Sequence, residues 1–157
     1  MARSRRRVVE RISLAGRLQL HRAKIRSAMF PYAWQRLINE IRKQVEQYSL
    51  MCGDRDSRLS FTRFVTGEYL IRRAQSYPII DLTLSLQQHL FVEFKYNYRN
   101  SDRTDTDTWG DLISLDVDEH DRTAFQYKDS KFRDEAELAH FLLTPLTDPN
   151  FVPPASQ

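Results

Sequence analysis

The sequence contains little cysteine, little glycine and no long apolar run. Its single cysteine, Cys52, cannot form an intrachain disulfide or a cysteine-based metal site, so we expect a reducing, cytoplasmic environment. No stretch approaches the roughly 18 consecutive apolar residues that a membrane-spanning helix needs. With four glycines in 157 residues, the chain has little material for a glycine-rich loop that binds phosphates.

The common sequence motifs of catalysis are also missing. The chain contains no G-x-S-x-G, G-x-G-x-x-G, Walker-type or H-E-x-x-H motif. His89 and His140 have no sequence neighbours that would make them general bases or metal ligands. We therefore expect no cofactor and no metal site, and the pattern favours a binding protein over an enzyme.

What the sequence does contain is an uneven distribution of charge. The whole chain has a net charge of +3, yet residues 1–30 hold nine basic residues and one acid, Glu10, for a net charge of +8. This leaves 15 of the 24 basic and 20 of the 21 acidic residues for the remainder, a net charge of −5. A basic segment attached to a mildly acidic body indicates contact with an anionic partner.

Residues 1–28 are expected to form a basic arm that is partly helical or disordered, because Val8, Ile12, Ala15 and Leu18 outline only an incomplete helical stripe. Three interpretations remain open. The arm is solvated or docks on an acidic protein; it binds nucleic acid by displacing counterions from phosphates; or residues 1–25 are an organellar transit peptide. The residues that we expect to contact an anion are Arg5, Arg6, Arg7, Arg11, Arg17 and Arg22.

Residues 31–50 have the clearest helical pattern. Pro31 suits the first turn of a helix, where its missing N–H would be unpaired anyway. One apolar stripe then follows at helical spacing, and it is expected to cover a sheet. Its members are Trp34, Leu37, Ile38, Ile41, Val45 and Tyr48.

Alternating apolar residues predict antiparallel strands in the middle of the chain. Residues 78–99 form two such runs, but Gln87-Gln88 is poor chemistry for a tight hairpin, so a longer or bulged turn is expected. Residues 58–76 are read as a weaker hairpin around Gly67, although the same residues would also make a helical face. Residues 99–111 form a polar loop, and residues 111–118 and 122–128 are two further strands.

The chain ends with a short helix over residues 134–144. Asp134 and Glu137 resemble a capping box at its start, and Pro145 is expected to end it. The tail, residues 147–157, holds three prolines and no apolar pattern, so it is expected to be flexible.

These elements predict an α+β fold. A four- to five-stranded antiparallel sheet carries an N-terminal and a C-terminal helix on one face, preceded by the basic arm, and residues 29–146 form a single domain. The opposite face of the sheet would be polar and could serve as a homodimer surface. Its polar residues are Thr83, Ser85, Glu93, Lys95, Asn97, Ser114 and Asp116.

Two functions remain open at this point. The first is a binding module that contacts nucleic acid or an acidic protein through the arm, although no zinc finger, helix-turn-helix or aromatic stacking platform accompanies it. The second is a small ligand-binding or catalytic domain with a pocket between the 31–50 helix and the sheet. In that case polar groups from Arg72, Arg73, His89 or Tyr96 should converge on the pocket.

Overall fold

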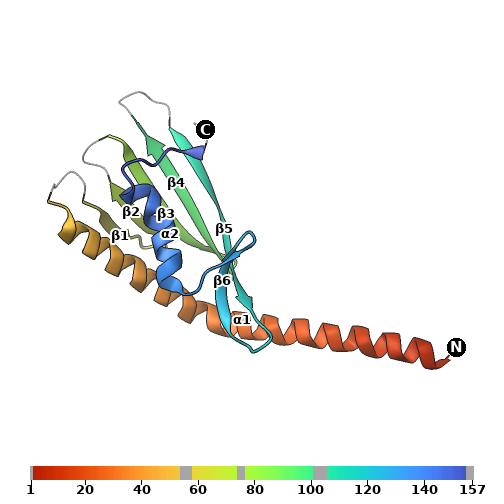
Figure 1. The fold of residues 1–157 in the computed structure, drawn as a ribbon. Helices are drawn as coiled ribbons and strands as arrows, with labels where there is room; N and C mark the ends of the chain where they lie inside the picture. Colours follow the sequence, from red (N-terminus) through yellow and green to blue (C-terminus); the bar gives the residue numbers. More distant parts are fainter. Residues whose placement is uncertain (1, 54–57, 74–76, 101–105, 155–157) are drawn as a thin grey trace.

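The computed structural model describes residues 2–53, 58–73, 77–100 and 106–154, with side chains from Leu14 onward. Within these residues the chain forms helix α1, seven strands and helix α2 (Figure 1). The helices are α1 (Ala2–Met51) and α2 (Glu135–Thr147). The strands are β1 (Ser60–Arg63), β2 (Tyr69–Arg73), β3 (Ile79–Gln87), β4 (Phe91–Arg99), β5 (Asp107–Val117), β6 (Thr123–Tyr127) and β7 (Ser130–Lys131).

The strands form one sheet in which each strand pairs antiparallel with the next along the chain, in the order β1 to β7. The predicted number of strands, four to five, is wrong, because the described sheet has seven. Strand β7 has only two residues, both exposed, so it shows no alternation that a sequence pattern could detect. The hairpin around Gly67 is confirmed as β1 and β2, and Gly67 has a φ of 89°, which favours glycine.

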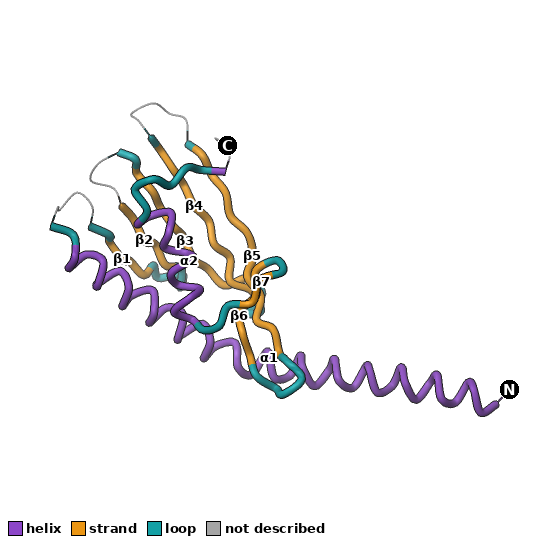
Figure 2. Tube along the Cα trace, in the orientation of Figure 1, coloured by secondary structure: helices purple, strands orange, loops and turns teal. Residues whose placement is uncertain are grey.

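Both helices cover the same face of the sheet, as predicted, and Figure 2 shows them lying across the strands. Alternation along each strand sends one set of apolar side chains to this face, for example Leu82 and Leu84 of β3 and Val92 of β4. The apolar stripe of α1 meets them with Leu37 and Ile38, which are fully buried. The predicted helix stripe therefore forms one wall of the core.

The start of the first helix differs from the prediction. Helix α1 begins at Ala2, and Pro31 lies inside it rather than in its first turn. An internal proline leaves one helical hydrogen bond unmade, yet Phe30 and Ala33 beside it are almost completely buried. The packing of the helix beyond Pro31 on the sheet therefore outweighs the local cost of the proline. The basic segment and the core helix are one continuous element.

The turn between β3 and β4 is bulged, which confirms the prediction. Gln88 and His89 both have positive φ, and the amide of Leu90 donates to the carbonyl of Gln87 at 3.1 Å. Two consecutive left-handed residues and this hydrogen bond are typical of a type I′ turn. Gln87 pairs with Phe91 rather than with Leu90, so three residues separate the paired positions and Leu90 is the additional, bulged residue.

Helix α2 begins as predicted and ends later. The Asp134 carboxylate accepts a hydrogen bond from the Glu137 amide at 2.9 Å, which confirms the N-terminal cap. Pro145 does not end the helix, which continues to Thr147. Pro145 is buried against the core, so its packing offsets the single helical hydrogen bond that it removes.

Candidate functional site

The most distinctive feature of the molecule is the part of α1 that extends beyond the sheet (Figure 1). The side chains of residues 14–24 are all mainly exposed to solvent, and the burial of α1 begins only at residues 25–30. At about 1.5 Å per residue, residues 2–24 extend about 35 Å along the helix axis. We refer to residues 2–24 as the projecting helix.

The projecting helix carries the residues predicted to contact an anion. Arg17 and Arg22 are both exposed. Arg5, Arg6, Arg7 and Arg11 lie on the same helix, but their side chains are outside the described part of the structure. At 100° per residue, these six positions are spread around the helix axis, so the positive charge surrounds the helix and does not form a single stripe.

The described leucines of the projecting helix are also exposed and also scattered around its axis. Leu14, Leu18 and Leu20 expose between 50% and 59% of their surface. Leu14 and Leu18 lie on one side of the helix, and Leu20 lies on a different side. An amphipathic helix that binds a membrane surface needs one continuous apolar face, and these three residues do not supply it.

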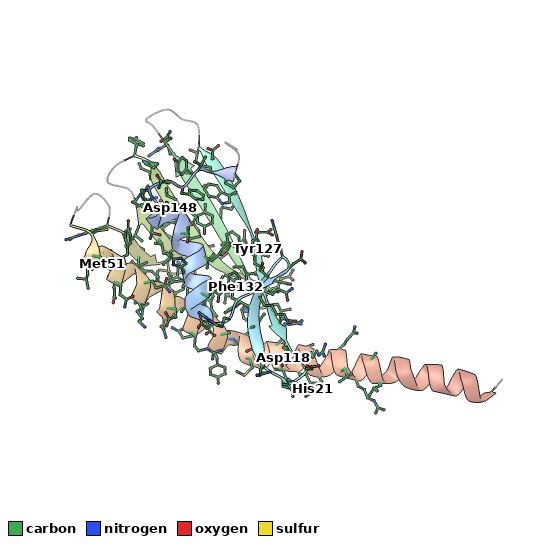
Figure 3. All side chains as sticks on the ribbon, viewed as in Figure 1. His21, Met51, Asp118, Tyr127, Phe132 and Asp148 are labelled. Atoms are coloured by element: carbon green, nitrogen blue, oxygen red, sulfur yellow. The ribbon has the colours of Figure 1, made fainter. Side chains whose placement is uncertain are left out.

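The direction of the projecting helix is fixed where it leaves the body. The imidazole Nε2 of His21 lies 3.1 Å from both carboxylate oxygens of Asp121, in the turn between β5 and β6. Figure 3 labels His21 and Asp118, a residue of the same turn. One helical turn further on, the Arg26 guanidinium donates to the Leu115 carbonyl at 2.8 Å. These two contacts hold the helix against the β5–β6 hairpin.

The β5–β6 turn itself is ordered by Asp118. Its carboxylate accepts hydrogen bonds from the backbone amides of Arg122, at 2.9 Å, and His120, at 2.8 Å. These bonds, that of Arg122 first, stabilise the ionised carboxylate and lower the pKa of Asp118. Asp121 is therefore presented to His21 by a turn that is already organised, which supports a fixed direction for the helix.

The opposite face of the sheet is mainly polar, although it includes the exposed Leu112, and several of its polar side chains pair with each other. Arg72 forms a bidentate ion pair with Asp81, with distances of 2.6 and 2.9 Å, which raises the pKa of Arg72. Thr108 donates to Asn97 at 2.9 Å, and Lys131 lies 2.7 Å from Asp116. The cross-strand pairs stabilise the sheet locally. A homodimer through this face stays a prediction.

The four residues predicted to converge on a pocket lie in different places. Arg72 is on the polar face, whereas the neighbouring Arg73 points to the other face and donates to the Leu146 carbonyl at 3.1 Å. Tyr96 is buried and its hydroxyl donates to the Leu142 carbonyl at 2.5 Å. His89 lines a cavity of about 700 Å³ at the Trp34 end of the helix–sheet interface, whereas Arg72 lines a separate cavity of about 450 Å³ on the polar face. Arg63 lines the same cavity as His89 from β1, and no pattern in the sequence singled it out.

Replacement of Tyr96 by phenylalanine is expected to lower the free energy of unfolding by about 1–2 kcal/mol, because the Leu142 carbonyl loses a buried donor. Burial raises the pKa of Tyr96, so the hydroxyl stays protonated in the folded state. Its contribution is complete below about pH 10, the unfolded pKa of tyrosine, and falls at higher pH. Urea denaturation of both proteins at neutral and alkaline pH measures this; a difference that grows with pH would contradict it.

The described residues contain no cluster of three or more histidine, cysteine, aspartate or glutamate side chains that could hold a metal ion. In the same part of the chain, no helix has both the length and the apolar character to cross a membrane. No known protein family, curated protein or solved structure matches the chain. The projecting helix and the cavity beside His89 are the two features of the described residues that indicate contact with a partner or a ligand.

Proposed function

We propose that the protein is a nucleic-acid-binding module and that the projecting helix is its contact element. The proposal rests on one observation: the helix that extends beyond the body also carries a strong excess of positive charge. Residues 1–30 have a net charge of +8 on a body of −5, and the described side chains of residues 14–24 are exposed. A basic segment of this kind gains affinity by displacing counterions from phosphates.

The shape of the projecting helix fits a duplex. An α-helix with its side chains is about 10–12 Å across, and the major groove of B-DNA is about 12 Å wide. Cations on every side of the helix would then face phosphates of both strands. The fixed exit of the helix at His21 and Arg26 favours insertion of a rigid rod over wrapping by a flexible tail.

Two other anionic partners receive less support. A membrane surface would require one apolar face, and Leu14, Leu18 and Leu20 are spread over different sides of the helix. An acidic protein would need carboxylates distributed around the helix, because its cations are not confined to one side. A duplex carries about one negative phosphate charge per 1.7 Å of its axis, so it supplies anionic groups around the helix without a specific protein surface.

The test is fluorescence anisotropy of labelled duplex DNA and single-stranded RNA with the full chain over a salt series. We expect the duplex to bind, with a slope of about −5 in log K against log salt if six arginines each neutralise one phosphate. The single strand should bind more weakly, because it offers no groove to a rigid helix. No binding at about 50 mM salt, or a slope near zero, would overturn the proposal.

A further inference from the structure

A cavity of about 700 Å³ lies beside the point where α1 leaves the body. It is bounded by α1 on one side and by the β1–β2 and β3–β4 turns on the other. Its inner wall includes Phe30, Trp34 and Tyr69, all at least nine-tenths buried. A volume of this size is within the range of pockets that hold small molecules. The cavity has no part in the proposed contact with nucleic acid.

The inner wall of the cavity favours an aromatic ligand. The rings of Trp34 and Tyr69 pack edge to face with their centroids 5.8 Å apart, so they form a rigid aromatic corner. Leu86 and Leu90 add aliphatic surface on the side of the β3–β4 turn. A planar ring that enters this corner would bury apolar area against side chains that are already held in place.

The outer rim of the cavity favours an anionic group on the ligand. Arg63 and His89 lie on the rim, and none of the described residues that line the cavity is acidic. The Arg63 guanidinium lies over the Tyr69 ring at 6.0 Å from its centroid, which places its positive charge next to the aromatic corner. A carboxylate attached to a bound ring would therefore meet a cation at the mouth of the cavity.

The β3–β4 turn supplies an independent observation. Gln88 and His89 have φ values of 54° and 56°, and both line the cavity. A type I′ turn is most favourable with Asn-Gly, whereas larger side chains in this region are strained. The pairing of β3 with β4 outweighs this strain and places both side chains at the rim, where Asn-Gly would leave only one short amide.

From these features we infer that the cavity binds a small aromatic acid. The ring packs in the corner formed by Trp34 and Tyr69, and the carboxylate faces Arg63 and His89. This inference concerns a small-molecule site and does not depend on the behaviour of the projecting helix with nucleic acid.

The experiment follows the two tryptophan indole N–H resonances by NMR during titration of the isotope-labelled full chain. The probe is naphthoate, and its neutral amide, naphthamide, is the matched control for charge. We expect naphthoate to shift the Trp34 resonance with a Kd below about 1 mM, and naphthamide to bind at least about tenfold more weakly. Trp109, which stacks on Tyr96 and Phe151 elsewhere in the core, serves as the internal control.

Two variants test the rim of the cavity. Arg63→Gln removes an exposed charge and should weaken naphthoate binding at least about tenfold. The double substitution Gln88→Asn and His89→Gly should raise the Tm, because it relieves the strained turn, and should also weaken binding by a similar factor. The inference is overturned if Trp34 does not respond, if the amide binds as tightly as the acid, or if either variant retains the original Kd.

Discussion

Substitution of Gly110 by alanine is expected to destabilise the fold by about 3 kcal/mol or more, at the upper end of the range for overpacked sites. A Cβ at this position would lie 2.2 Å from the Phe94 carbonyl oxygen and 3.0 Å from the Lys95 Cα. Both are backbone atoms of the neighbouring strand β4, so no side-chain rotation relieves the clash. The β4–β5 ladder must separate instead, and Phe94 in the core must move with it.

The matched control is Gly16→Ala, where the new Cβ would meet no atom within 4 Å apart from the neighbouring backbone of its own helix. Alanine is favoured over glycine by about 1 kcal/mol in a helix interior, so this change should raise the helical content of the projecting helix and leave the unfolding of the body unchanged. Urea denaturation and circular dichroism of both variants measure the two effects. Equal midpoints for Gly110→Ala and the wild type would show that β4 and β5 are not held as closely as described.

The sequence predicts the elements whose apolar pattern faces the core. The stripe from Trp34 to Tyr48 and the alternation of Leu82 and Leu84 each have a buried partner surface, and burial imposes the helical or strand period on the sequence. The described side chains of residues 14–24 are exposed and have no such partner surface, so this part of the helix shows no apolar stripe. Their helical state had to come from the structure.

Local preferences mislead where tertiary packing is stronger. Pro31 has the character of a helix start, yet the buried residues on both sides of it keep α1 continuous. Pro145 has the character of a helix end, yet it is buried and α2 continues to Thr147. In both places the local sequence preference contributes less free energy than the long-range contacts that oppose it.

The residues of the candidate sites differ in how far the sequence can predict them. Strand alternation alone shows that the neighbours Arg72 and Arg73 cannot share a pocket, and this part of the pocket prediction could have been rejected from the sequence. By contrast, Arg63 and His89 meet at the cavity only because two separate turns lie beside α1. No sequence spacing encodes that juxtaposition, so the rim of the cavity could not have been predicted.

Replacement of six arginines of the basic segment by glutamine is expected to abolish most binding to duplex DNA. Glutamine has nearly the same helix propensity as arginine, so the projecting helix should persist while the net charge of the chain changes from +3 to −3. Each lost phosphate contact lowers the salt slope by about one unit, so the slope should fall by about five and the affinity by at least about 100-fold at moderate salt. The residues are Arg5, Arg6, Arg7, Arg11, Arg17 and Arg22.

The control for this variant removes six exposed charges from the body and leaves the projecting helix intact. It reaches the same net charge of −3, so it separates the position of the charge from its total. We expect it to keep a salt slope within about one unit of the wild type. If both six-residue variants lose affinity equally, binding follows net charge alone and the projecting helix is not the contact element. The control residues are Lys43, Arg58, Lys95, Arg99, Lys128 and Arg133.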